Sequence, residues 1–90
     1  MDIKIDKNNE TPAYRQIIEQ ITIQIRDGKL SAGDRLPPER ELASELGVAR
    51  GTVKSAYEKL AANNIIEIAQ GRGTFVSSGQ YIMAEGRKEN

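Results

Sequence analysis

Residues 36–57 read LPPERELASELGVARGTVKSAY, and this stretch decides the fold. Its first half predicts a short helix, because Leu42, Ala43 and Leu46 stand at the i, i+3, i+4 spacing of a buried face. Gly47 follows and supplies the left-handed residue that commonly ends a helix. The sequence therefore predicts a helix that stops sharply at a corner.

The second half predicts another helix, which starts near Arg50. Its apolar positions recur at helical spacing and are Val53, Ala56, Tyr57 and Leu60. The small Ala43 lets the two helices cross closely, and Gly47 with Val48 forms the corner between them. This spacing is typical of a helix-turn-helix, whose second helix enters the DNA major groove. An ordinary helical hairpin in a small core is the alternative.

A further helix is predicted before this pair, over residues 12–26, with Thr11 as N-cap and Pro12 at the first helical position. Its apolar stripe consists of Tyr14, Ile17, Ile18, Ile21 and Ile25. The alternation of isoleucines would also fit a strand, but the length and the cap favour a helix. Ile23 then lies off the stripe and is a candidate for a partner surface, although single exposed apolar residues are common.

A β-hairpin is predicted after the third helix, which Asn63-Asn64 ends because asparagine tolerates the left-handed conformation. Residues 65–69 and 74–76 are predicted strands on either side of a glycine-containing turn at residues 70–73. Three helices followed by this hairpin predict a winged helix-turn-helix, mainly α with a small β-hairpin, over residues 11–77.

Three segments carry weaker patterns. Residues 1–10 are polar and are expected to form a flexible N-terminal arm. Residues 30–35, with Gly33-Asp34, are expected to be a turn-rich connector. Residues 78–90 contain the spare apolar run Tyr81-Ile82-Met83 and are expected to be a linker, or the start of a missing C-terminal dimerisation or effector region.

The composition excludes several classes of function. The 90 residues allow one small domain, and they include no cysteine and no histidine. Disulfides, thiolate zinc sites and Ser-His-Asp triads are therefore excluded within this chain. The pairs Glu39 with Glu41 and Glu41 with Glu45 are interpreted as surface carboxylates on a polar helix face. We expect no enzyme activity, no cofactor, no metal, no membrane segment and a cytoplasmic location.

The charge distribution favours a nucleic-acid partner although the formal net charge is zero. Residues 46–57 carry Arg50 and Lys54 and no acid, while the acids gather on the preceding helix. With the predicted core face turned inward, Gly51 and Ser55 point outward, and Thr52 and Lys54 flank them. Arginine and lysine at such positions can reach guanine edges or phosphates. A solvated polar face is the alternative reading.

The hairpin turn adds one more basic group. Arg72 stands between Gly71 and Gly73, so no neighbouring side chain hinders its approach to a minor groove or to phosphates. The alternative is a solvated turn arginine. The same glycines could suggest a nucleotide loop, but the following helix and the Lys-Ser/Thr pair are missing.

At the level of whole motifs, the chain resembles the GntR family of bacterial transcription regulators. The matching runs are Pro12–Ile17, Ile25–Leu30, Gly33–Pro37, Glu39–Ala43, Leu46–Val48, Thr52–Val53 and Gly71–Val76. The resemblance implies an N-terminal winged helix that binds operator DNA as a dimer and is usually attached to a C-terminal effector-binding or dimerisation domain. It also implies DNA contacts for Arg40, Arg50, Lys54 and Gly71, and Thr52 matches the family threonine near the phosphates.

Four positions depart from that family pattern. Pro38, expected in the first turn of its helix, replaces a common serine, and with it a hydroxyl contact to phosphate is lost. Ala49 replaces the usual serine N-cap, a change worth about 1 kcal/mol. Gly51 replaces a larger polar residue, and Asn64 replaces a glycine. Tyr57, with Pro12-x-Tyr14, resembles the YtrA-like or MocR-like branches.

The sequence thus predicts sequence-specific binding of a double-stranded DNA operator for transcription regulation, most often repression at an inverted repeat. The predicted contact residues are Arg40, Arg50, Gly51, Thr52, Lys54, Ser55, Gly71 and Arg72. The alternative is a winged helix that serves as a protein-interaction or dimerisation module and does not bind DNA. That module would need no basic recognition face, and its hairpin would carry an apolar patch.

Overall fold

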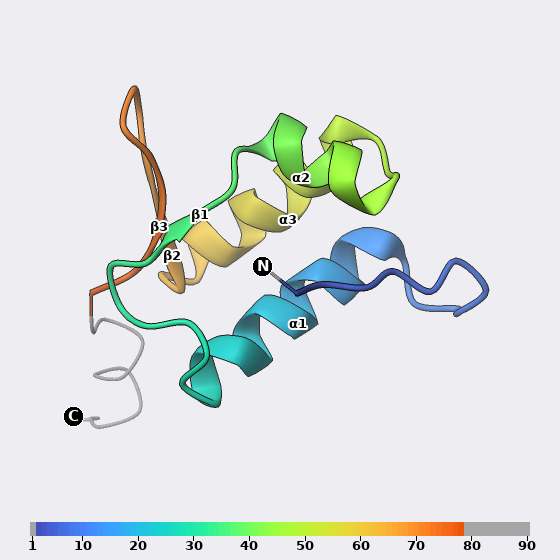
Figure 1. Cartoon of the computed structure of the whole chain (residues 1–90), viewed down its shortest axis with the longest axis horizontal. Helices are drawn as coiled ribbons and strands as arrows, with labels where there is room; N and C mark the ends of the chain where they lie inside the picture. Colours follow the sequence, from blue (N-terminus) through green and yellow to red (C-terminus); the bar gives the residue numbers. More distant parts are fainter. Residues whose placement is uncertain (1, 79–90) are drawn as a thin grey trace.

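The computed structural model describes residues 2–78, whose arrangement is shown in Figure 1. The elements in chain order are α1 (Ala13–Arg26), β1 (Arg35–Leu36), α2 (Glu39–Leu46), α3 (Arg50–Ala62), β2 (Ile66–Ala69) and β3 (Gly73–Val76). Helix α3 packs against both α1 and α2, and the β2–β3 hairpin extends from the helices as a wing (Figure 1). The predicted winged helix-turn-helix is confirmed. The apolar run 81–83 lies outside the described residues.

The core lies between the three helices and the inner side of the sheet. Its buried apolar side chains are Ile3, Ile17, Ile21, Leu36, Leu42, Ala43, Val53, Ala56, Tyr57, Leu60, Ile66 and Val76. The predicted inward faces of α1, α2 and α3 are confirmed, since the other predicted members Tyr14, Ile18, Ile25 and Leu46 are half-buried and pack against this set. Ile23 is 46% exposed, as its position off the α1 stripe predicted. None of the helices within residues 2–78 has the length and apolar character needed to cross a membrane.

The sheet contains a third strand, β1, that the sequence did not predict. The strand order is β1-β3-β2, and β3 pairs antiparallel with both neighbours. Arg35 lies opposite Phe75, and the connection continues as Val76 N–H donates to the Asp34 carbonyl at 2.8 Å. Residues 30–35 were expected to be only a connector. A two-residue strand is too short to show alternation, so the sequence carries no periodic signal for it.

Two helices begin one residue later than predicted. Pro12 and Pro38 are N-caps with ψ values of 151° and 152°, and neither helix has a side-chain cap. Thr11 is therefore not the N-cap of α1, and Pro38 is not inside the first turn of α2. The fixed φ of proline suits either position, and in both cases its carbonyl accepts the first intrahelical bond, from Gln16 N–H at 3.1 Å and Leu42 N–H at 3.0 Å.

The N-terminal arm runs along α1 (Figure 1). Glutamine side chains of α1 hold it there. Lys4 N–H donates to Gln20 Oε1 at 3.0 Å, and Gln20 Nε2 donates to the Lys4 carbonyl at 2.7 Å. Gln16 makes the same reciprocal pair with the backbone of Asp6, at 2.9 and 3.0 Å. Each amide side chain thus replaces the neighbouring strand that an extended segment would otherwise need.

Further contacts tie the arm to the core and to the helix-turn-helix corner. Ile3 is 6% exposed, and Lys7 Nζ donates to the Gly47 carbonyl at 3.2 Å. Because α2 has no basic residue in its last turn, Lys7 supplies the cation that a helix C-terminus favours. The prediction of a flexible arm missed these contacts, since bonds between side chains and backbone leave no periodic pattern in a sequence.

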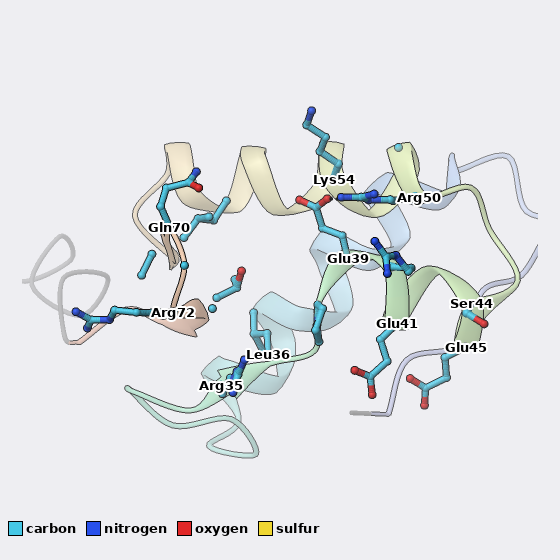
Figure 2. A pocket seen from close by; sticks show the side chains of 18 residues that line it. Arg35, Leu36, Glu39, Glu41, Ser44, Glu45, Arg50, Lys54, Gln70 and Arg72 are labelled. Atoms are coloured by element: carbon cyan, nitrogen blue, oxygen red, sulfur yellow. Dashed lines mark ion pairs between the residues drawn. The ribbon is translucent and has the colours of Figure 1, made fainter.

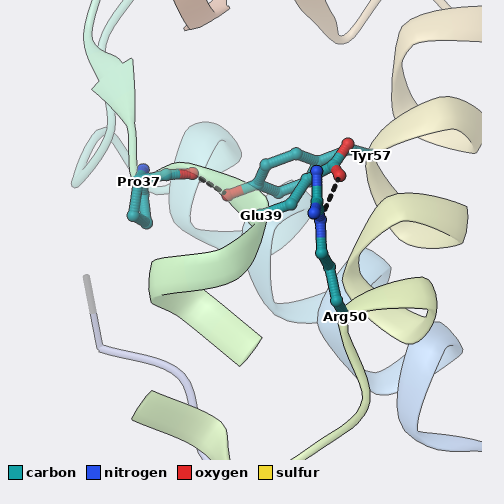
Figure 3. Close-up of polar contacts among 4 residues, drawn as sticks. All are labelled: Pro37, Glu39, Arg50 and Tyr57. Carbon is teal, nitrogen blue, oxygen red and sulfur yellow. Dashed lines mark hydrogen bonds and ion pairs between the residues drawn. The ribbon is translucent and has the colours of Figure 1, made fainter. Parts of the chain in front are cut away.

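One hydrogen bond joins α3 to the junction between β1 and α2. Tyr57 is fully buried, and its hydroxyl donates to the Pro37 carbonyl at 2.7 Å (Figure 3). Burial raises the pKa of the Tyr57 phenol well above its ordinary value of 10.0, and the carboxylates of Glu39 and Glu41 raise it further. The neutral, donating form is therefore the one that the folded protein holds.

We expect Tyr57→Phe to lower the free energy of unfolding at pH 8 by about 1–2 kcal/mol, because the Pro37 carbonyl loses its donor. The pH dependence should also differ. Since the folded-state pKa is raised, the unfolded chain loses the phenol proton first, and wild-type stability falls as pH rises above 10. In the wild type the free energy of unfolding should fall by up to about 1.4 kcal/mol per pH unit in this range. The Phe variant has no phenol at this position and should not show this fall. Urea unfolding of both proteins between pH 8 and 11 measures the difference, and parallel curves would contradict it.

Candidate nucleic-acid interface

An open groove lies between α2, the N-terminal half of α3 and the wing (Figure 2). Its basic lining residues are Arg35, Arg40, Arg50, Lys54 and Arg72. Its acidic lining residues are Glu39, Glu41 and Glu45. Five basic groups against three acids give this surface a positive balance, although the whole chain has a formal net charge of zero.

The corner between α2 and α3 has the predicted geometry. Gly47 adopts φ 70° and ψ 35°, and its N–H donates to the Ala43 carbonyl. Val48 N–H donates to the same carbonyl at 3.0 Å, and its side chain packs against the core. Ala49 is the N-cap of α3 and provides no side-chain cap, as its replacement of serine implied. The direction of α3 is therefore set by the two backbone hydrogen bonds to the Ala43 carbonyl and by the packing of the Val48 side chain against the core.

Helix α3 presents the predicted residues in two groups. Arg50, Gly51 and Lys54 line the groove, and all three are exposed. Ser55 is exposed and Thr52 is half-buried, and neither lines the groove. A Cβ built on Gly51 meets nothing within 4 Å, so this part of the helix surface is open to a close approach.

The wing tip carries Arg72 on a tight turn. Gly71 has φ 78°, and Arg72 N–H donates to the Ala69 carbonyl at 2.9 Å. The Arg72 side chain is exposed and extends away from α3 and from Lys54 (Figure 2). Arg40, from α2, is also exposed and lines the groove. The structure thus brings Arg40, Arg50, Lys54 and Arg72 to one concave surface, together with Gly51 and Gly71.

Arg35, which was not among the predicted contact residues, enters this surface through strand β1. Its guanidinium lies against Gly73, the first residue of β3 directly after the wing-tip turn, where an added Cβ would stand 3.0 Å from Arg35 Nε. Gly73 also adopts φ 126°, which side chains rarely tolerate. The sequence signals for Arg35 were its charge in a connector and its place in the matching run Gly33–Pro37. Neither signal placed it on this surface, because its partner strand lies far along the chain.

The separation of charges that the sequence suggested does not hold in three dimensions. Glu39 opens α2, yet its Oε1 lies 3.5 Å from Arg50 Nε at the start of α3 (Figure 3). Within residues 2–78 this is the one ion pair. The acid-free stretch 46–57 therefore receives a carboxylate from the preceding helix, because the corner folds α2 back beside α3.

These features define a class of protein: a winged helix-turn-helix domain with a mixed but net positive groove between its second helix, third helix and wing. Residues 13–76 match the sequence profile described as "Bacterial regulatory proteins, gntR family". The chain belongs to this family, as the motif resemblance predicted.

The chain is 40% identical over 86 residues to the HTH-type transcriptional repressor YtrA of Bacillus subtilis, covering 94% of this chain and 66% of that protein. Among solved structures, YtrA from Sulfolobus acidocaldarius, a GntR-family transcription factor, superimposes with a TM-score of 0.79 at 47% identity, over 84% of this chain and 80% of that one. The AraR DNA-binding domain in complex with operator ORE1 superimposes with a TM-score of 0.71 at 31% identity, over 86% and 94% of the two chains. This chain spans 31% of the HTH-type transcriptional repressor NagR of Bacillus subtilis and 15% of the probable rhizopine catabolism regulatory protein MocR of Rhizobium meliloti.

Proposed function

We propose that this domain binds double-stranded operator DNA with sequence specificity and regulates transcription, acting as a repressor. The observation that carries the proposal is the groove between α2, α3 and the wing, with its five basic side chains. Membership of a family of bacterial regulatory proteins supports it. The similarity to a domain whose structure includes operator DNA supports it independently.

In this proposal α3 enters the major groove, while the wing reaches a neighbouring minor groove or its phosphates. The proposed contact residues are Arg40, Arg50, Gly51, Thr52, Lys54, Ser55, Gly71 and Arg72. The exposed, unhindered surface at Gly51 supports a close approach of α3 to the bases. Thr52 and Ser55, which do not line the concave surface, are proposed to contact the phosphates that flank it.

A protein-interaction module is the second candidate, and one observation favours it. Ile68 on β2 is 38% exposed, so the wing does carry an apolar side chain. A single exposed isoleucine is common on protein surfaces and indicates little. A wing that binds only protein would not need five basic side chains around one groove. We therefore favour DNA.

We expect Arg50→Ala and Lys54→Ala to weaken operator binding in different ways. If Arg50 reads a guanine, its loss costs about 1–3 kcal/mol at one base pair and relaxes the choice there. If Lys54 holds a phosphate, its loss weakens binding to all sequences alike and flattens the salt slope by about one unit. Titration against matched and scrambled duplexes at several salt concentrations separates the two. Wild-type affinity in both variants would contradict the assignment of α3.

We expect Arg72 to prefer A·T-rich DNA beside the half-site, because a narrow minor groove has a more negative potential. Arg72→Ala should abolish the preference for A·T-rich over G·C-rich flanks and leave the half-site preference intact. Competition between duplexes that differ only in their flanks measures this effect. A variant that keeps the flank preference would reduce the wing to a structural role.

We propose that the regulator acts as a homodimer, formed on DNA or through a further C-terminal region, because one helix reads too few base pairs for useful discrimination. Selection from a random duplex pool should enrich two inverted half-sites. Sedimentation should find this 90-residue chain monomeric or weakly dimeric alone, and present in two copies on that duplex. A tight dimer without DNA would refute this assembly, and a pool without enrichment would favour the protein-interaction module.

A further inference from the structure

The ion pair between Glu39 and Arg50 joins the first residues of the two helices of the motif. The contact runs from Glu39 Oε1 to Arg50 Nε at 3.5 Å. The Arg50 side chain is 62% exposed and the Glu39 side chain is 25% exposed. The carboxylate is thus the more enclosed partner, and the guanidinium lies beside it, reaching it from the start of α3 (Figure 2).

The surrounding contacts hold the Glu39 carboxylate in place. Glu39 follows Pro37 and Pro38, whose φ angles are restricted by their rings. The Pro37 carbonyl accepts the hydrogen bond from Tyr57, so this junction is attached to the buried side of α3 (Figure 3). Glu39 also stands in the first turn of α2, where the helix dipole favours a negative charge. The carboxylate therefore keeps a defined position relative to the helix that carries Arg50.

The ion pair between Glu39 and Arg50 is not explained by a contribution to folding stability or by a contribution to overall DNA affinity. Ion pairs with this much exposure contribute little to folding. A carboxylate beside a DNA-binding surface repels phosphates and lowers affinity for every duplex. Glu39 can however fix the orientation of Arg50. An arginine engaged at Nε still has its two terminal amines, and these form the fork that matches guanine O6 and N7.

We propose that Glu39 is a positioning residue that orients Arg50 for recognition of one base pair, so that affinity for all duplexes is lowered and discrimination between them is raised. This inference rests on the proposed DNA-binding function. It concerns only how one base pair is selected. The carboxylate acts through Arg50 and makes no base contact of its own.

The other two acids of the groove provide a comparison within the same helix. Glu41 and Glu45 line the same groove and carry the same charge. Neither forms an ion pair with a residue of the described part of the chain, and both point away from Arg50 and Lys54 (Figure 2). Glu41→Gln therefore removes the same charge from the same surface without affecting the orientation of Arg50.

The test compares Glu39→Gln with Glu41→Gln on the duplex selected by the wild-type chain, its single base-pair variants and a scrambled duplex, at one salt concentration. Both variants should bind the scrambled duplex about two- to fivefold more tightly, because each has lost one repulsive charge. Only Glu39→Gln should reduce the ratio between matched and mismatched duplexes. The reduction should fall at one base pair and lie within the roughly 5- to 150-fold range of a bidentate contact.

The Arg50→Ala background provides the decisive control. If Glu39 acts through Arg50, adding Glu39→Gln to Arg50→Ala leaves discrimination at that base pair unchanged, and urea unfolding verifies that each variant is folded. An equal loss of discrimination in Glu39→Gln and Glu41→Gln, or a further loss in the double variant, would overturn the positioning role. A wild-type chain without any sequence preference would instead overturn the proposed function itself.

Discussion

The hydrogen bond from the Tyr57 hydroxyl to the Pro37 carbonyl is the constraint on which the groove depends. Tyr57 lies on the buried face of α3, and Pro37 follows directly after β1. The bond therefore fixes the start of α2 and the end of β1 against α3. Since β1 pairs with β3, the same bond also sets where the wing stands relative to the helices. The α2 and α3 walls of the groove are thus joined directly by this contact, and the wing is joined to it through β1.

The arm adds a second constraint from the opposite side of the motif. Gln16 and Gln20 hold residues 4–6 along α1, and Lys7 then reaches the Gly47 carbonyl at the helix-turn-helix corner. Helix α2 is thus held at its start by the Tyr57 hydrogen bond to Pro37 and at its end by the Lys7 hydrogen bond to Gly47. For a short helix such as α2, contacts at both ends matter more than intrinsic helix propensity. These end contacts act together with the backbone bonds of the corner to hold α2 against α3.

The sequence predicted the elements whose signal is local and periodic. The buried faces of α1 and α3, the left-handed Gly47 and the β2–β3 hairpin all follow from spacing or from one special backbone position. Among the predicted contact residues, six line the groove, and their charge or their place in the family motif had indicated them. They are Arg40, Arg50, Gly51, Lys54, Gly71 and Arg72. Strand β1, with Arg35, was missed because two residues show no alternation. The pairing of Glu39 with Arg50 was missed because charge counted along the chain does not register a helix that folds back.

A groove with three acids among five basic groups is a poor design for tight, unspecific binding to phosphates. The same arrangement suits a protein that recognises a particular base sequence. When the sequence-independent term is small, a larger share of the binding free energy comes from contacts that differ between sequences, and the ratio of specific to unspecific affinity rises. The formal net charge of zero also keeps the long-range attraction to any DNA small, so it too lowers the sequence-independent part of binding. On the proposed function, the acids of α2 are therefore part of the recognition surface, and one of them, Glu39, is close enough to an arginine to affect its geometry as well as its field.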